Sequence, residues 1–457
     1  MHGASQRRAP KYLNLRQGCA GQKMLLEVTR ERPAALPADR ATLLIEHASE
    51  LVTLGWSFGD GARGGLWQGD PGLIHDGAVA VGGDGRVLAV GPTARVREIV
   101  ELAPKARVYD ASGCAIVPGL VDACAEAIVS VSEDPAVGGA ARHRRMRPAA
   151  DPVAAALALS ERDLIASIWR RLDTLLLSGT TGAVLTSGYV LEPDDEMALL
   201  RAVQAITEVG PLSVVGAFRA AGITPSENRV SADEYVALLA HELLPDIADE
   251  ELATLFTLAA DHTTLSLEQS WRILRAAQTH GLRRRLEYSA TSHPGVVDFA
   301  EEMGVGSVVL LDAPSEDDML RLADSQLTAI LSVGADGVAT WGRHCARRLI
   351  ELGVPVALGT GGGPMGGAST TMLDALRFAC NGLGLTPAEA LVAATLNAAF
   401  ASGMGDDVGP LEPGKRADLL ILNTPSYARL PYEASDDPIR AVVKDGWLVV
   451  DQGARVA

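Results

Sequence analysis

The chain has 457 residues, 47% of them hydrophobic, and this length favours one large domain with an accessory domain, or two to three smaller domains. Its formal net charge of -17 argues against nucleic acid and anionic membranes as partners, because both require clustered basic side chains. The five cysteines are scattered, and no apolar run reaches the roughly 18 residues of a membrane helix. These features predict a cytoplasmic protein without disulfides or membrane spans.

The first part of the chain is expected to be an extension followed by β-structure. Residues 1–38 are rich in Arg, Pro and Gly with little periodicity, which predicts an N-terminal extension that is ordered only by contact with a partner. From Ala41 onward, short runs with β-like composition alternate with turn residues. The runs are 42–45, 51–54, 77–81 and 87–90. This pattern predicts the first part of a small β-sandwich over residues 39–117.

Alternating strand and helix patterns follow from Gly119 to about residue 404. A strand ending near Cys124 is followed by seven apolar runs, at 182–185, 212–217, 253–258, 284–288, 307–311, 327–333 and 354–358. Amphipathic helical patterns lie between them, at 163–177, 232–244, 267–279 and 343–352. Helix starts are predicted at Ser160 and Ser266, and helix ends at Gly281, Gly304 and Gly353. Eight βα units in succession predict a TIM barrel over residues 118–404.

Beyond residue 404 the pattern returns to β-structure, with runs at 417–422 and 439–450 and a turn at Asp445-Gly446. Because the termini of a closed barrel can lie near each other, we expect residues 405–457 to complete the sandwich. The predicted fold is therefore α/β: a (β/α)8 TIM barrel with a small β-sandwich domain formed from the N- and C-terminal segments.

Several segments resemble one family of barrel proteins. Residues 118–126 read P-G-L-V-D-A-C-A-E and resemble the first barrel strand of the amidohydrolase superfamily, P-G-[LF]-[VI]-D-x-H-x-H. Residues 409–421 resemble the segment by which that superfamily leaves the barrel. Within the superfamily the chain is most similar to imidazolonepropionases, which hydrolyse a cyclic amide in histidine breakdown. The segments that carry this similarity are 179–189, 232–235, 386–391 and 395–399, and the resemblance runs from about residue 41 to the C-terminus.

The resemblance implies a dimer and a metal-dependent hydrolase. In such enzymes a divalent metal, usually zinc or iron, lowers the pKa of a bound water, and an aspartate after strand 8 accepts its proton. This chain departs from the family pattern at six positions, which are Cys124, Glu126, Gly222, Glu287, Leu310 and Gly361. The first five stand where the family has histidines, and Gly361 stands where it has the aspartate.

Loss of the histidines together with the base removes both the metal ligands and the proton acceptor. We therefore expect no catalytic residue, no metal cofactor and no hydrolysis. The expected function is that of a non-catalytic subunit, or pseudoenzyme, which stabilises or regulates a partner or binds a small ligand in the old pocket. The partner is a second copy in a homodimer or an active homologue in a heteromer. Candidate pocket residues are Tyr189, His262 and His293, which also fit structural roles as a core cap and as surface-loop histidines.

An altered metal site is the alternative. Cys124, Glu126 and Glu287 replace ligands that converge in the barrel mouth, and thiolate and carboxylate both bind zinc. On this alternative the chain hydrolyses a C–N bond of a cyclic amide or related substrate, through zinc or iron at these three residues or without a metal.

Two further segments invite a binding role and have a plainer interpretation. Residues 359–369 are rich in glycine but lack the lysine of a phosphate-binding loop, so we interpret them as a flexible or tightly packed replacement for the metal loop. The run 143–147, His-Arg-Arg-Met-Arg, is the basic cluster that we single out in the sequence. We interpret it as a solvated loop rather than an anion site.

Overall fold

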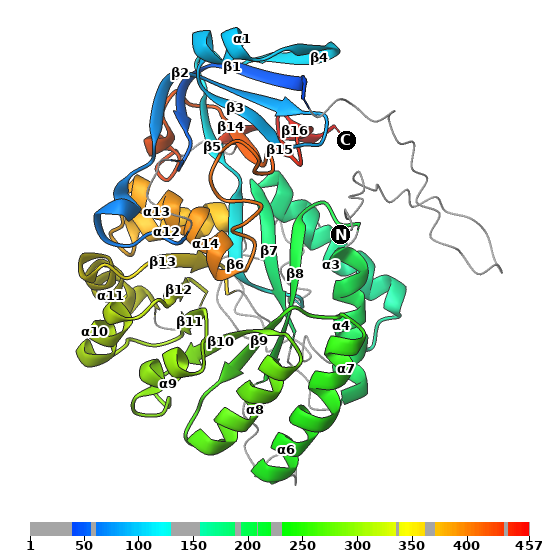
Figure 1. Ribbon diagram of the computed structural model, residues 1–457, viewed down its shortest axis with the longest axis vertical. Coiled ribbons are helices and arrows are strands. Elements are labelled where there is room, and N and C mark those ends of the chain that lie inside the picture. The colour runs from blue at the N-terminus through cyan, green and yellow to red at the C-terminus, as the bar shows by residue number, and fades with distance from the viewer. Residues whose placement is uncertain are drawn as a thin grey trace, which may run out of the picture.

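The computed structural model describes residues 39–55, 61–128, 156–187, 193–207, 209–220, 231–334, 338–361, 371–433 and 437–456. These residues form a barrel of eight parallel strands surrounded by helices and, at one end of the molecule, a mixed sheet built from both terminal regions (Figure 1). Among them, no helix is long and apolar enough to cross a membrane. The predicted extension at 1–38 and the basic run at 143–147 lie outside the described residues.

The barrel strands occur in the sheet in the same order as in the chain, and all seven neighbouring pairs are parallel. They are β6 Leu120–Glu126, β7 Thr180–Thr186, β8 Ser213–Ala220, β9 Leu255–Ala259, β10 Arg283–Tyr288, β11 Ser307–Leu310, β12 Thr328–Ser332 and β13 Val356–Gly359. Each of the eight strand segments identified in the sequence overlaps one of these strands. The predicted TIM barrel is therefore confirmed.

Helices cover the outside of the barrel (Figure 1). They are α3 Glu161–Leu177, α4 Pro193–Thr207, α6 Ala232–Leu238, the π-helical turn η3 Leu239–Leu243, α7 Leu244–Asp249, α8 Leu267–Thr279, α9 Val296–Glu302, α10 Glu316–Asp324, α11 Val338–Leu352, α12 Met372–Asn381, α13 Pro387–Ala393 and α14 Leu396–Ala401. Ser160 Oγ accepts from the Asp163 backbone N–H, and Ser266 forms a capping box with Gln269. The glycines expected to end helices have φ values of +76°, +61° and +92° at Gly281, Gly304 and Gly353.

The barrel interior is filled by small and branched side chains. Val121, Ala123, Val309, Ile330 and Ala357 form one cluster with alanines of α14. Helix α14 lies at the N-terminal end of the strands, because the backbone N–H of Val121 donates to Ala394 O just before this helix. The N-terminal half of the barrel is thus a packed core, which leaves the carboxyl ends of the strands as the open end.

The two edge strands of the barrel, β6 and β13, are joined by a buried carboxylate. Asp122 is fully buried and accepts from Thr360 N at 2.9 Å, from Thr360 Oγ1 at 2.7 Å and from Cys124 N at 3.1 Å. The backbone N–H of Gly361 donates to Cys124 O at 2.7 Å. A Cβ on Gly359 would lie 2.7 Å from Cys124 Cβ, so glycine permits this close approach. Burial raises the pKa of Asp122, and the two donors on Thr360 oppose that rise.

The terminal regions form one nine-stranded mixed sheet. Its strands are β1 Ala41–Val52, β2 Leu73–Gly82, β3 Val87–Pro92, β4 Leu102–Asp110, β5 Ala115–Pro118, β14 Leu419–Leu422, β15 Ile439–Lys444, β16 Trp447–Asp451 and β17 Ala454–Arg455, with helix α1 Thr93–Ile99 and the short helix η4 Tyr427–Arg429 beside it. The short helix η1 Gly65–Gly69 lies against the barrel helices α11 and α13. Strand β1 is the branch point, since it pairs with β2, β4 and β5. Side chains from both arms share one core, so the sheet wraps around it as the predicted sandwich requires.

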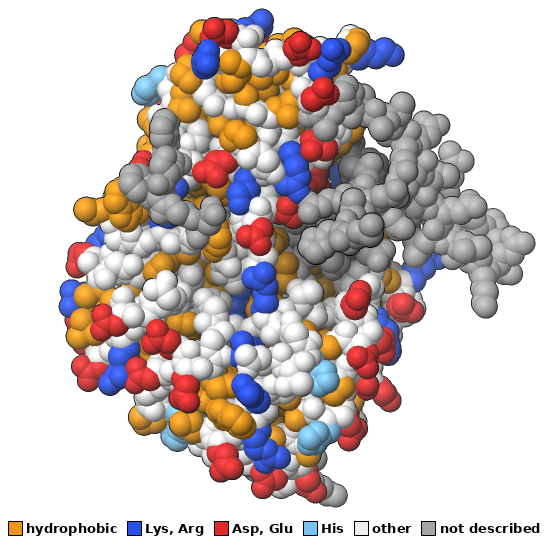
Figure 2. Space-filling view, viewed as in Figure 1, with side chains coloured by type: hydrophobic (Ala, Val, Ile, Leu, Met, Phe, Trp, Pro, Cys, Tyr) orange, Lys and Arg blue, Asp and Glu red, His pale blue; other side chains and the backbone are white. Residues whose placement is uncertain are grey.

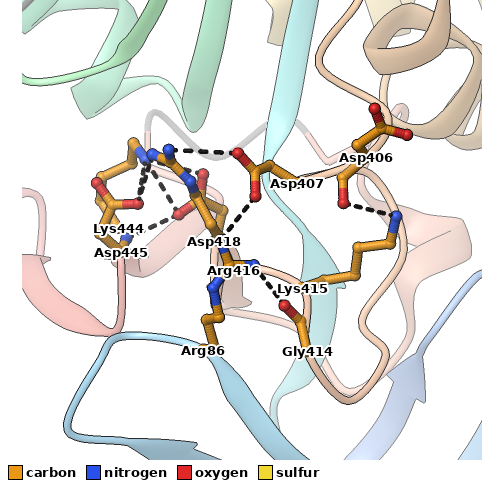
Figure 3. A network of polar contacts seen from close by, with 9 residues as sticks. All are labelled: Arg86, Asp406, Asp407, Gly414, Lys415, Arg416, Asp418, Lys444 and Asp445. Carbon is orange, nitrogen blue, oxygen red and sulfur yellow. Dashed lines mark hydrogen bonds and ion pairs between the residues drawn. The ribbon is translucent and has the colours of Figure 1, made fainter. Parts of the chain in front are cut away.

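An ion-pair network holds this sheet to the loop that follows α14 (Figure 3). At its centre, Lys444 Nζ lies 3.0 Å from Asp418 Oδ2 and 3.0 Å from Asp445 Oδ1, and the side chains of Lys444 and Asp418 are 6% and 4% exposed. Arg416 bridges Asp445 at 3.1 Å and Asp407 at 3.4 Å. Residues 409–421, which resemble the segment by which the family leaves the barrel, therefore connect the barrel to the terminal sheet.

Candidate functional site

The candidate site lies at the carboxyl ends of the barrel strands, where TIM-barrel proteins place their binding residues. The structure describes five of the six positions that depart from the family pattern. Cys124 and Glu126 lie on β6, Glu287 on β10, Leu310 at the end of β11 and Gly361 just after β13. Gly222, Tyr189 and residues 362–369 of the glycine-rich segment lie outside the described residues.

An ion pair across the barrel dominates this site. The guanidinium of Arg219, near the end of β8, donates from Nε to Glu287 Oε1 at 2.6 Å and from Nη2 to Glu287 Oε2 at 2.8 Å. The side chain of Glu287 is 8% exposed and that of Arg219 is 26% exposed. Both oxygens of Glu287 are therefore engaged by one cation in the bidentate geometry that arginine favours.

Cys124 and Glu126 belong to the same electrostatic group. The negative charge of Glu287, reinforced by that of Glu126, raises the pKa of Arg219 above its already high value, so Arg219 stays charged at any pH at which the protein is folded. Burial raises the pKa of the Cys124 thiol to about 12. Arg285 opposes that rise, whereas the surrounding carboxylates add to it. At neutral pH Cys124 is therefore a neutral thiol rather than a thiolate.

A second arginine lies deeper in the barrel. Arg285 is 1% exposed and donates from Nη1 to Ala123 O at 2.8 Å, from Nη2 to Ala401 O at 3.0 Å and from Nε to Ser307 Oγ at 3.2 Å. It thereby ties β10 to β6, β11 and α14. Burial lowers its pKa, and the nearby carboxylates of Glu287 and Asp122 oppose that change. Arg285 thus places a second positive charge in the barrel, deeper than that of Arg219.

These residues do not fit the divalent metal that the family resemblance implies. Both oxygens of Glu287 are already bound by Arg219, and the side-chain positions at Leu310 and Gly361 offer no donor atom. Among the described residues, no three His, Cys, Asp or Glu side chains are arranged to hold one metal ion. The Cys124, Glu126 and Glu287 set is thus gathered around a guanidinium and lacks the geometry of a metal-binding cluster.

Gly361 occupies a position that cannot take a side chain as the backbone stands. Its φ is +53°, and a Cβ there would lie 1.7 Å from Ser332 Oγ. An aspartate at this place would therefore need both a strained backbone and a different rotamer of Ser332. The backbone conformation and the packing at residue 361 therefore favour glycine.

We expect Gly361→Ala to lower the free energy of unfolding by about 2 to 4 kcal/mol, the sum of left-handed strain and overpacking. Gly353→Ala is the matched control, because Gly353 also has positive φ but nothing lies within 4 Å of its added Cβ. The control should cost only about 1 kcal/mol. Equal losses in the two variants, measured by urea unfolding, would show that the contact with Ser332 is unimportant.

The raised thiol pKa predicts low reactivity for Cys124. Relative to an ordinary value of 9.0, a pKa of about 12 lowers the thiolate fraction at pH 8 roughly a thousandfold. We expect iodoacetamide to label the Cys124 peptide at least about a hundredfold more slowly in the folded protein than in urea, as followed by mass spectrometry. A rate in the folded protein within a few fold of the unfolded one would contradict the partly buried, protonated thiol.

The remaining candidate residues lie at different places. Leu310 is fully buried and packs with the layer between strands and helices, whereas its neighbour Val309 faces the barrel interior. His262 and His293 lie in the loops after β9 and β10, with ring centroids 6.1 Å apart. Each ring binds a backbone carbonyl, that of Thr291 at 2.6 Å and that of Leu265 at 2.7 Å. These bonds support the structural interpretation of the two histidines.

Sequence reasoning missed the two arginines. Arg219 follows Val215 and Ala217 at spacings of two, which places it on the inward face of its strand. A charged residue on the inward face of a barrel strand is a signal that could have been found, as is Arg285 two residues before Glu287. Their partners could not have been found in this way, because Arg219 and Glu287 are 68 residues apart in the chain.

Comparison with known proteins identifies the class. The amidohydrolase family model matches residues 228–449. Solved structures with this fold include the guanine deaminase of E. coli, with a TM-score of 0.65 and 19% identity over 89% of this chain and 98% of that chain. An adenosine deaminase from Xanthomonas campestris has a TM-score of 0.62 and 21% identity over 92% and 95% of the two chains. These likenesses show the fold.

The family follows from closer relatives. An imidazolonepropionase of Symbiobacterium thermophilum is 38% identical over 422 residues, covering 90% of this chain and 98% of the relative. An imidazolonepropionase of Geobacillus kaustophilus is 32% identical over 421 residues, with 90% and 98% covered. The chain therefore belongs to the amidohydrolase family and is an imidazolonepropionase-like member of it.

Proposed function

We propose that this chain is a non-catalytic imidazolonepropionase-like subunit in which a guanidinium has taken the place of the metal. The observation that carries the proposal is the bidentate pair between Arg219 and Glu287 at the barrel mouth. A guanidinium supplies positive charge and fixes a carboxylate, but it has no open coordination position and cannot lower the pKa of a bound water. The same pair joins β8 to β10 at the barrel mouth without metal.

The glycine at 361 supports the same proposal. The base that would accept a proton from the attacking water is replaced by a residue whose surroundings exclude a Cβ. A substitute base within the mouth would need a free carboxylate or imidazole, and Glu287 is held by Arg219. What remains at the barrel mouth is an arginine charge that is already paired with Glu287.

The proposed role is to stabilise or regulate a partner. The partner is a second copy of this chain or an active homologue, and a small ligand in the mouth is a further possibility within the same proposal. The extent of the similarity supports it, since the matched region covers 98% of the relative from Symbiobacterium thermophilum. The surfaces through which such proteins assemble would then be present even where the chemistry is not.

Metal content and hydrolysis are tested together. The full chain is produced in medium supplemented with zinc and iron, analysed for metals, and assayed for opening of the imidazolone ring, with the Symbiobacterium thermophilum relative prepared in parallel. We expect less than about one metal per ten chains and no turnover above buffer. Near-stoichiometric metal that disappears in Cys124→Ala and Glu287→Ala would overturn the proposal in favour of the altered-site hydrolase.

The partner is tested separately. An active imidazolonepropionase from the same cell is co-expressed with the tagged chain, and the two are passed through size-exclusion chromatography. We expect a mixed complex whose hydrolytic activity or melting temperature differs from that of the active protein alone. Recovery of the chain only as a free homodimer, with no effect on the homologue, would contradict the heteromer and leave the homodimer as the assembly.

A further inference from the structure

A cavity of about 400 Å³ lies at the opposite end of the barrel from the candidate site, where β9, β10 and β11 begin. Its walls include Gln278, Arg283, Arg284, Ser307, Phe400 and Ala401. None of the described residues that line it is acidic. In a chain with a net charge of -17, a cavity walled by two arginines and no carboxylate stands apart from the rest of the surface.

Arg283 brings an unneutralised charge to this cavity. Its side chain is exposed and lies over Gly403, where a Cβ would come within 2.7 Å of Arg283 Nη1. Within the described part of the chain, the side chain of Arg283 has no hydrogen bond or ion pair. Its five N–H donors are therefore available to a ligand.

Arg284 is only partly satisfied. It donates from Nη1 to Met303 O at the end of α9, while its Nε is buried and has no partner among the described residues. Burial lowers the pKa of Arg284, and the nearby charge of Arg275 on α8 lowers it further. No carboxylate opposes these two effects. Arg275 itself lies over the ring of Trp271 at 5.9 Å. Three arginines thus gather here without an acidic partner.

Several arginines elsewhere on the surface are paired with carboxylates. Arg201 forms a bidentate pair with Glu250 at 2.8 Å, and Arg348 binds Glu316. Figure 2 shows basic side chains following one another down the middle of the barrel, in the area where Figure 1 places β9, β10 and α8, with acidic side chains mostly toward the edges. Like charges that gather without counter-charges repel one another, so a bound anion would stabilise this region.

We propose that this cavity binds a small molecule through a phosphate group. Two guanidiniums carry about the charge that a phosphate monoester needs at neutral pH, and their N–H groups match its oxygens. The ring of Phe400 forms an apolar wall for the rest of the molecule. Gly281 and Gly306 leave the required space, because a Cβ on either would meet nothing within 4 Å. The site is separate from the barrel mouth and does not depend on the proposed function.

Calorimetric titration of the full chain tests the proposal, with inorganic phosphate and phenyl phosphate as probes at constant ionic strength. We expect saturable binding of both. Tighter binding of phenyl phosphate identifies an organic phosphate as the natural ligand, whereas equal affinities identify inorganic phosphate. Arg283→Gln should weaken binding at least about tenfold, the scale of one charge-assisted hydrogen bond. Because Arg283 is exposed and unpaired, this variant should fold as the unmodified chain does.

Arg348→Gln is the matched control, since it removes an arginine of equal charge far from the cavity. Its affinity for both probes should be unchanged. The proposal is overturned if neither probe binds saturably, or if Arg283→Gln and Arg348→Gln bind phosphate equally well. An equal weakening in both variants would likewise overturn it, because that result would indicate attraction by net charge rather than a site.

Discussion

In the Arg219→Ala variant we expect the free energy of unfolding to fall by about 3 to 5 kcal/mol. The reason is that Glu287, whose side chain is 8% exposed, would lose the cation that binds both its oxygens. A buried carboxylate without a partner is costly, whereas the intact pair is close to neutral relative to apolar residues. Urea unfolding followed by circular dichroism measures the change.

The surface pair of Arg201 with Glu250 provides the control. It has the same bidentate geometry at 2.8 Å, but its side chains are 50% and 44% exposed. Arg201→Ala should therefore cost no more than about 1 kcal/mol. Combining Arg219→Ala with Glu287→Gln should restore part of the loss, because the neutral amide needs no counter-charge. Equal losses in the free energy of unfolding for Arg219→Ala and Arg201→Ala would show that burial does not make the barrel pair more important than the surface pair.

In the Lys444→Ala variant we also expect a loss of about 3 to 5 kcal/mol, for a structural reason. Asp418 would be left buried with its side chain 4% exposed, and the link from β15 to β14 would be broken (Figure 3). Burial raises the pKa of Asp418 and Lys444 opposes this, so removing Lys444 pushes the carboxyl further toward its protonated form. Thermal and urea unfolding measure the loss.

Lys415 is the control for this second variant. It belongs to the same network, but its Nζ binds only the backbone carbonyls of Gly405 at 2.7 Å and Asp406 at 3.0 Å. Lys415→Ala should cost about 1 kcal/mol. Pairing Lys444→Met with Asp418→Leu should bring stability back toward that of the unmodified chain, since replacing both buried charges removes the desolvation penalty. A loss as large as that of Lys444→Ala alone would show that the charges themselves are needed.

The fold could be predicted from local patterns. Strand and helix positions follow from apolar runs and helical spacing, and the helix ends follow from side chains such as Ser266 and from Gly281, whose roles depend on a few neighbouring residues. Each βα unit is built from contiguous residues, so its class is visible without knowledge of distant contacts. The joining of the two terminal regions was predicted from the barrel closure that it requires.

The candidate site was predictable by position and not by contact. Cys124, Glu126 and Glu287 could be placed at the barrel mouth, yet the cation between them comes from another strand. The pairing of β6 with β7 shifts between Asp122 and Ala125, so simple alternation does not determine which side chains face inward there. The run of three arginines that begins at Arg283 was likewise overlooked, because its isolation from carboxylates appears only in three dimensions.

The buried seam at Asp122 has a consequence for how this family is recognised. The carboxylate of Asp122 joins β6 to β13. Gly119, just before β6, lets the chain pass close to β7, because a Cβ there would lie 2.2 Å from Thr181 Oγ1. Both residues serve the packing of the barrel strands. They are also two of the positions in the motif by which the chain resembles the amidohydrolases. A search that relies on such residues detects the architecture of the barrel and is blind to the reaction inside it. Assigning an activity to such a chain therefore requires inspection of residues at the mouth, such as Arg219.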